Sequence, residues 1–82
     1  MQVQIDQASD IGQYIRAVRK AQGLRQDDLA AMAGTSHVVL GNVERGKDTV
    51  QIGRVFELLR QLGIRVQLDL PVELPPSTAE QG

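Results

Sequence analysis

Several residue types that stabilise small domains are missing from this chain. Its 82 residues include no Cys, which excludes a disulfide framework and a thiolate-bound zinc site. It has no Trp, and Tyr14 and Phe56 are its only aromatic residues. The core must therefore be aliphatic. Because a chain of this length buries a marginal core, we expect a single domain that gains support from association between copies.

Long apolar runs are absent as well. No stretch approaches the roughly 20 apolar residues that a membrane-spanning helix needs. The first ten residues, MQVQIDQASD, have no basic region followed by an apolar run, so they do not resemble a secretion signal. We therefore expect a cytoplasmic protein that has no membrane partner.

The residues that carry enzyme chemistry are also scarce. There is one His and no Cys, so neither a metal cluster nor a nucleophile–base pair is evident, and no Gly-rich loop suggests a phosphate cradle. Asp27 and Asp28 are adjacent, and on a helix adjacent side chains diverge, so they cannot act as a carboxylate pair. The sequence predicts neither an enzyme nor a metal or cofactor site.

The charge is distributed unevenly along the chain. The formal net charge is −1, yet all nine Lys and Arg lie within residues 11–65. That segment holds five acidic residues, which gives it a net charge of +4, and the other five acidic residues flank it. A basic body is compatible with an anionic partner, although a solvated surface of mixed charge explains the same composition.

Four segments show the spacing of amphipathic helices: 9–22, 26–33, 36 to about 45, and 50–62. In the first, Ser9 or Asp10 is the expected N-cap. Each segment ends at a glycine, which is typical of a helix C-terminus. Ile11, Tyr14, Ile15 and Val18 follow the spacing of one buried face, and Leu40 and Val43 are expected to face the core. The other apolar residues of these segments are Leu29, Met32 and Ala33 in the second and, at helical spacing, Val55, Phe56, Leu59 and Leu62 in the fourth. Arg16, Arg19 and Lys20 project elsewhere, as phosphate contacts or, in the interpretation we favour, as solvated charges.

The period changes to two in the next segment, IRVQLDL. Ile64, Val66, Leu68 and Leu70 alternate with polar residues, which predicts a strand with one apolar face. A lone strand leaves its backbone groups unpaired. Residues 2–6, QVQID, are one candidate partner, but antiparallel pairing with a second copy across a two-fold axis also buries the apolar faces. We expect a domain over residues 7–70 and a disordered tail over 71–82.

The stretch 26–46, QDDLAAMAGTSHVVLGNVERG, has the pattern of a helix-turn-helix. Ala30 is small where the third helix crosses the second, and Gly34 tolerates the positive φ of a sharp turn. Leu40 and Val43 anchor the third helix on the core. This spacing leaves one exposed face on that helix, which we expect to carry Ser36, His37, Val38, Gly41 and Asn42.

The segment GLRQDDLAAMAGTSHVVLGNVERGK resembles the Xre/Cro-type helix-turn-helix repressors, and the resemblance extends over residues 11–62. It implies an all-α, lambda-repressor-like domain of four to five helices, with one C-terminal β-strand that pairs across a dimer. The next residues, TVQIGRVFELLRQLGIRVQLDLP, are similar to the HipB-type antitoxins. That similarity implies a repressor of its own operon, which binds an inverted-repeat operator in double-stranded DNA and a HipA-type serine/threonine kinase toxin.

The resemblance and the exposed face of the third helix together predict a DNA interface. The N-terminal end of such a helix enters the major groove. Val39 is expected either to contact the DNA or to be half-buried between the helices, and Glu44 to pair with Arg45 or Arg54. Predicted base contacts are Ser36, His37, Val38 and Asn42, predicted phosphate-side contacts are Arg25, Gln26, Val39, Arg45 and Lys47, and predicted dimer contacts are Ile64, Val66, Leu68 and Leu70.

Two other functions remain open at the level of sequence. One is a stand-alone Xre-type repressor that has no toxin partner. The other is a protein-binding module with weak DNA affinity, which the acidic net charge and the apolar third helix favour. The basic 11–65 segment and the residues Gln26 and Arg45-Gly46-Lys47 favour DNA binding instead.

Overall fold

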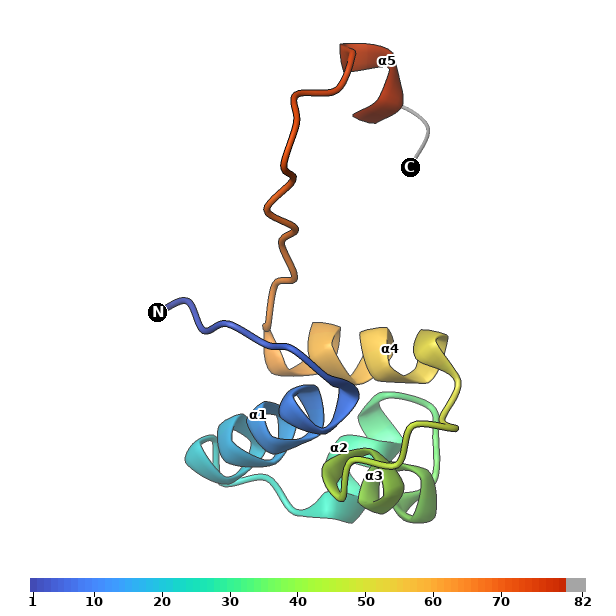
Figure 1. Ribbon diagram of the computed structural model, residues 1–82. Coiled ribbons are helices and arrows are strands. Elements are labelled where there is room, and N and C mark those ends of the chain that lie inside the picture. The colour runs from blue at the N-terminus through green and yellow to red at the C-terminus, as the bar shows by residue number, and fades with distance from the viewer. Residues whose placement is uncertain (80–82) are drawn as a thin grey trace.

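Helices form the body of the protein in the computed structural model, which describes residues 1–79 (Figure 1). Within these residues the helices are α1 (Ala8–Ala21), α2 (Gln26–Met32), α3 (His37–Glu44), α4 (Ile52–Leu62) and the short α5 (Pro76–Ala79). The first four match the predicted segments to within two residues at each end. They form an all-α domain, as expected.

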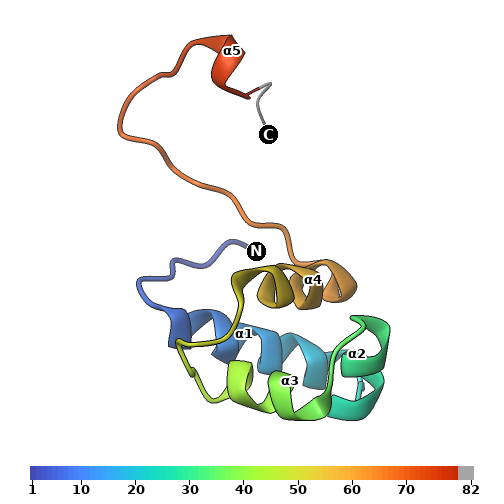
Figure 2. The same cartoon turned by 90° about the vertical axis from the view of Figure 1, so that its right-hand side faces the viewer.

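The first four helices enclose one aliphatic core. α1 packs against α3 and α4, and α2 packs against the same two helices. The core lies between these four helices (Figures 1 and 2). Ile15, Leu29, Leu40 and Leu58 are fully buried. The remaining buried apolar residues are Ala30, Ala33, Val43, Leu59 and Leu62.

The buried face of α1 differs from the predicted one. Its buried residues are Gly12, Ile15 and Arg19, which follow one another at intervals of three and four. Ile11 and Val18 are half-buried beside this line, and Tyr14 is 38 % exposed. The expectation that Arg19 is solvated was wrong. The buried face is rotated relative to the predicted one, since it includes a glycine and an arginine, which hydropathy alone does not mark as buried.

Gly12 lies where α1 and α3 approach most closely. A Cβ atom at this position would overlap the carbonyl oxygen of Val43 and lie 3.0 Å from the carbonyl carbon of that residue. Both are backbone atoms, so no side-chain rotation can relieve the contact. The distance between α1 and α3 therefore depends on the missing side chain of Gly12.

The helix ends agree with the sequence at their glycines. Gly23, Gly34, Gly46 and Gly63 all have positive φ, between 67° and 81°, which is the conformation that glycine adopts without strain. The N-cap of α1 differs from the prediction, because it is Gln7 and not Ser9 or Asp10. The carboxylate of Asp10 instead accepts hydrogen bonds from the backbone N–H groups of Asp6 and Gln7, at 2.8 and 3.2 Å.

The strand predicted over residues 64–70 is not formed within the single chain. Across residues 1–79 no segment is a strand, and residues 64–70 run extended away from α4 (Figure 1). A strand requires a backbone partner, and residues 2–6 pair with this segment only through the side chains of Gln2 and Gln67, at 3.2 Å. Pairing with a second copy stays a prediction.

The segment predicted to be a disordered tail includes α5, at Pro76–Ala79. An extended stretch separates it from the four-helix body (Figures 1 and 2). Residues 80–82 of the predicted tail lie outside the described residues. Among the described residues, no helix combines the length and the apolar character needed to cross a membrane.

Candidate nucleic-acid interface

α2 and α3 are joined by a short, tightly bonded turn. The backbone N–H of Thr35 donates to the carbonyl of Ala30 at 2.9 Å, and Gly34 between them has a φ of 67°. Ser36 is the N-cap of α3, and its Oγ accepts from the backbone N–H of Val39 at 3.2 Å. Ala30 is 2 % exposed and Leu40 is fully buried, so the predicted helix-turn-helix packing is confirmed.

The N-terminal part of α3 faces outward. Ser36 and His37 are exposed, and Val38 is 58 % exposed. Val39 is half-buried, in agreement with one of its two predicted environments. These three exposed side chains lie at the N-terminal end of α3, and the turn holds this end away from the core.

The C-terminal part of α3 is less open than predicted. Nη2 of Arg45 donates to Oδ1 of Asn42 at 2.7 Å. Gly41 is buried, and a Cβ atom there would lie 3.1 Å from Nη1 of Arg45. The expected exposed position of Gly41 is therefore wrong, because the guanidinium of Arg45 lies over it.

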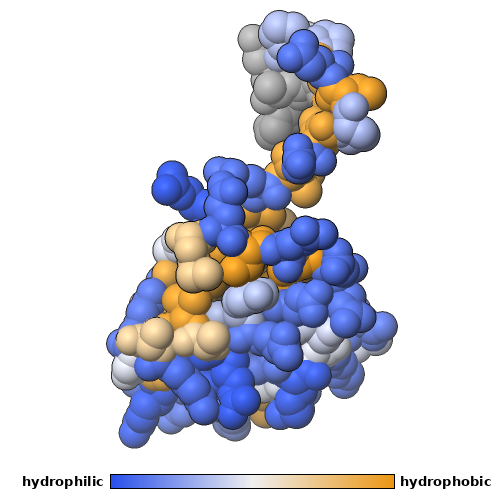
Figure 3. All heavy atoms as spheres, turned by 60° about the vertical axis from the view of Figure 1, so that its left-hand side comes forward, coloured by the Kyte–Doolittle hydropathy of each residue, from blue (hydrophilic) through white to orange (hydrophobic). Residues whose placement is uncertain are grey.

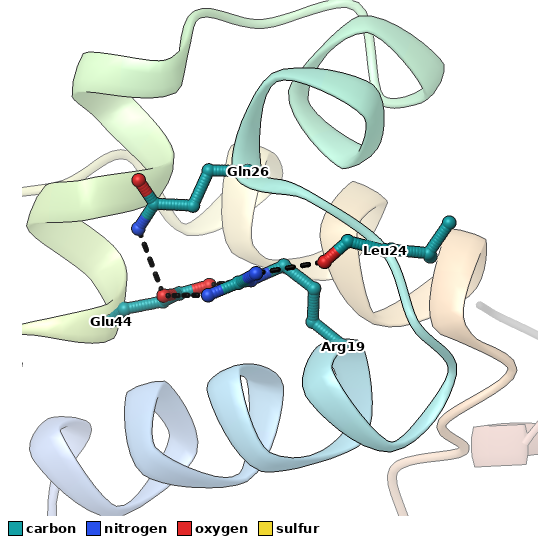
Figure 4. Close-up of polar contacts among 4 residues, drawn as sticks. All are labelled: Arg19, Leu24, Gln26 and Glu44. Atoms are coloured by element: carbon teal, nitrogen blue, oxygen red, sulfur yellow. Dashed lines mark hydrogen bonds and ion pairs between the residues drawn. The ribbon is translucent and has the colours of Figure 1, made fainter.

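A buried ion pair joins the end of α1 to the end of α3 (Figure 4). Arg19 donates from Nε to Oε2 of Glu44 at 2.7 Å and from Nη2 to Oε1 at 3.0 Å, in a two-bond geometry that orients both groups. Its Nη1 donates to the carbonyl of Leu24 at 2.8 Å. Glu44 is thus a structural residue as predicted, but its partner is Arg19 and not Arg45 or Arg54.

Gln26 belongs to the same network. Its Nε2 donates to Oε1 of Glu44 at 3.0 Å, so the start of α2 is tied to the end of α3 (Figure 4). One amide hydrogen and the amide oxygen of Gln26 remain for other contacts. The predicted phosphate contact at this residue is therefore held in a fixed orientation by the fold.

The network determines the charge state of Glu44. Burial raises the pKa of this carboxyl, but the hydrogen bonds from Arg19 and Gln26 and the nearby positive charges outweigh it, so the pKa lies below the ordinary value. The hydrogen bonds that Arg19 donates to Glu44 raise the pKa of Arg19 despite its burial. The two groups form a charged pair at neutral pH.

Two of the predicted phosphate contacts, Arg25 and Lys47, lie before α2 and after α3 in the chain. Arg25, at the start of α2, has its side chain 75 % exposed and lies 3.5 and 3.6 Å from the carboxylates of Asp27 and Asp28. Lys47 is exposed in the connection between α3 and α4. It borders a hollow of about 340 Å³ lined by Val39, Asn42, Lys47, Thr49, Val50, Gln51 and Arg54.

Three features in and around the helix-turn-helix were not predicted from the sequence. Arg54 borders the hollow, and its Nη1 donates to the carbonyl of Gly34 at 3.2 Å, which links α4 to the turn. Arg19 was missed although it lies four residues after Ile15, on the same helical face. The Arg45–Asn42 contact follows an i, i+3 spacing.

Among the described residues, no three His, Asp or Glu side chains gather in a way that would hold a metal.

Comparison with known proteins identifies relatives with this arrangement. The helix-turn-helix family HTH_3 matches residues 15–68. The HTH-type transcriptional regulator y4mF of Sinorhizobium fredii is 42 % identical over 73 residues, which cover 89 % of this chain and 96 % of the relative.

Solved structures share the fold. The restriction-modification controller protein C.AhdI of Aeromonas hydrophila is 34 % identical, with a TM-score of 0.63 over 71 % of this chain and 84 % of its own. A chain of the HipA–HipB–O2–O3 complex has a TM-score of 0.78 over 87 % of this chain and 100 % of its own, at 21 % identity. The matched family covers both helices of the turn and the core around them, and the chain therefore belongs to the helix-turn-helix family of transcriptional regulators.

Proposed function

We propose that this protein is a sequence-specific repressor that binds an inverted-repeat operator as a dimer and acts as the antitoxin of a HipA-type kinase. The observation that carries the proposal is the exposed N-terminal part of α3. Ser36, His37 and Val38 are exposed on a helix whose opposite side is fixed by buried Leu40 and Val43. A helix held in this way is suited to the major groove.

The charge around α3 supports DNA as the ligand. Arg25 caps the start of α2, Arg45 caps the end of α3 and Lys47 follows it, so exposed cations lie at both ends of the helix-turn-helix segment along the chain. Such cations contact phosphates and position the helix, while the base edges provide the sequence information. The relatives named above are regulators, and HipB of the same fold was solved in a complex with the O2 20mer.

Fluorescence anisotropy tests the DNA-binding function. We expect affinity of tens of nanomolar or better for DNA taken from upstream of the protein's own reading frame, with much weaker binding to scrambled DNA and a steep loss with salt. His37→Ala should weaken specific binding about tenfold, whereas Gln13→Ala, an exposed change on α1, should not. Equal weak binding to both DNAs would favour a protein-binding module.

The extended segment supports dimerisation. In the single chain Val66, Leu68 and Leu70 are 48 %, 82 % and 50 % exposed, although they alternate as the apolar face of a strand. Figure 3 shows apolar residues on this segment and on the surface of the body below it. Antiparallel pairing of two such segments would satisfy their backbones and cover these side chains.

Leu68→Asp should weaken the dimer without unfolding the helices, because Leu68 makes little contact within the chain. Sedimentation equilibrium should show a dissociation constant raised at least tenfold, and operator affinity should fall with it. Gln67→Asp adds the same charge on the opposite face of the segment and is the matched control. A dimer of unchanged strength in Leu68→Asp would mean that another surface joins the copies.

The toxin partner rests on the likeness to HipB. A chain of this fold occurs in a complex with HipA, and the likeness covers 87 % of this chain. Co-purification with a HipA-type kinase encoded beside the gene tests this part of the proposal. His37→Ala should retain kinase binding while its operator affinity is weakened, and a protein that binds its operator but no such kinase is a stand-alone repressor.

A further inference from the structure

The side chain of Arg45 is folded back along α3. Its guanidinium lies over Gly41, where a Cβ atom would be only 3.1 Å from Nη1, and its Nη2 donates to Oδ1 of Asn42 at 2.7 Å. Gly41 is buried by this arrangement, in the middle of a helix. Glycine costs about 0.5–1 kcal/mol there relative to alanine, and the space it leaves is occupied by Arg45.

The contact fixes which end of the Asn42 amide is available. A guanidinium carries only donors, so the amide oxygen must face Arg45 and the amide N–H₂ group faces away from it. Asn42 is half-buried and borders the hollow beside α3. Asn42, held by Arg45, thus forms a head whose amide hydrogens remain to donate, while its oxygen already accepts from a cation.

The two purines place different demands on such a head. Adenine is recognised by asparagine when the amide oxygen accepts from N6 and the amide nitrogen donates to N7. Guanine presents two acceptors, N7 and O6, in the major groove. With its oxygen bonded to Arg45, Asn42 cannot offer adenine an unhindered acceptor, and the guanidinium also repels the N6 amino hydrogens. The amide hydrogens of Asn42, which face away from Arg45, match the acceptors of guanine.

We propose that Arg45 is a positioning residue that makes Asn42 select guanine over adenine in the operator, and that Gly41 permits this by leaving space for the guanidinium. The inference rests on the proposed DNA-binding function and deepens it, because it assigns one base of the half-site. Arg45 was predicted only as a phosphate contact, and here it acts through Asn42 on sequence preference.

Selection from a pool of random double-stranded DNA tests the assignment. The wild-type protein should enrich an inverted repeat with guanine at one position of each half-site, and Asn42→Ala should lose the preference at that position alone. Arg45→Met keeps the unbranched apolar part of the side chain and removes its donors. It frees the Asn42 oxygen and should shift the preference there from guanine to adenine by about tenfold.

Arg25→Met is the matched control, since Arg25 is also an exposed arginine at a helix end. It should lower affinity for all sequences similarly and leave every base preference unchanged. Gly41→Ala should push the guanidinium of Arg45 aside by a few tenths of an ångström and produce a smaller shift in the same direction as Arg45→Met. Circular dichroism confirms that each variant is folded before selection.

The outcomes separate the inference from the function on which it rests. If the wild-type protein enriches no motif, sequence-specific DNA binding itself is wrong. If it enriches a motif whose preferences are unchanged in Arg45→Met and Gly41→Ala, the protein reads DNA but Arg45 does not direct Asn42. Adenine selected by the wild-type protein at the position that depends on Asn42 would also overturn the inference.

Discussion

Gly12→Ala is expected to destabilise the protein by about 3 kcal/mol or more, near the upper end of the range for overpacked cores. The added Cβ atom would overlap the carbonyl oxygen of Val43, so α1 and α3 must separate to admit it. A chain of this length has a free energy of unfolding of about 4–12 kcal/mol. Thermal unfolding followed by circular dichroism should show a midpoint lower by about 12–24 °C.

Gly53→Ala is the matched control for this substitution. Gly53 is exposed in α4, and a Cβ atom added there would meet nothing within 4 Å apart from its chain neighbours and the backbone of its own helix. Alanine at such a site should stabilise the helix by up to about 1 kcal/mol. The same chemical change should therefore have opposite signs at the two positions. A midpoint in Gly12→Ala equal to the wild-type one would show that α1 and α3 adjust to the methyl group at no cost.

Arg19→Met should lower the free energy of unfolding by about 3 kcal/mol, the typical cost of removing one partner of a buried ion pair. The side chain of Glu44 is 3 % exposed, so its carboxylate would be left in the core with Gln26 as its remaining side-chain donor. Urea denaturation measures the loss. Arg60→Met is the matched control, because Arg60 and Glu57 form a pair whose side chains are 66 % and 37 % exposed, and exposed pairs contribute about 0–1 kcal/mol.

The pH dependence provides a second readout of the same pair. The pKa of Glu44 is lower in the folded protein than its ordinary value of 4.5, so the unfolded chain takes up the proton first as the pH falls. The stabilisation from Glu44 is complete above pH 4.5 and is lost as the pH falls through the lower folded pKa. Glu44→Gln should remove this component, and an unchanged acid transition in that variant would assign the loss to other carboxyl groups.

The helices and their ends were predictable because local rules determine them. Apolar spacing marked the four segments, and the four glycines that follow them all have positive φ. The line of Gly12, Ile15 and Arg19 on α1 was not predicted, although its spacing is regular. Hydropathy treats a glycine and an arginine as surface residues, while their burial depends on the backbone of Val43 and the carboxylate of Glu44, which lie more than 20 residues away in the sequence.

The candidate site was predictable in part for the same reason. The exposure of His37 and Val38 follows from the period of α3, and the structure agrees with it. The contact of Gln26 with Glu44 depends on packing between helices, which periodicity does not contain. The contact of Arg45 with Asn42 has a regular i, i+3 spacing, but whether it forms depends on the side-chain rotamers. The strand over residues 64–70 requires a partner backbone, so one chain alone neither forms it nor rules it out.

The arrangement of α3 separates the residues proposed to read DNA from those that stabilise the fold. His37 and Val38 are exposed, so replacing them should change stability by no more than about 0.5 kcal/mol. Substitutions at these two positions can therefore change the proposed base preference without stabilising substitutions elsewhere. Asn42 is different, because a new residue there also releases Arg45. If the proposed base contacts hold, operator preference in descendants of this sequence should change one base at a time where residues 37 and 38 read DNA, and by paired substitutions of residues 42 and 45 where Asn42 reads it.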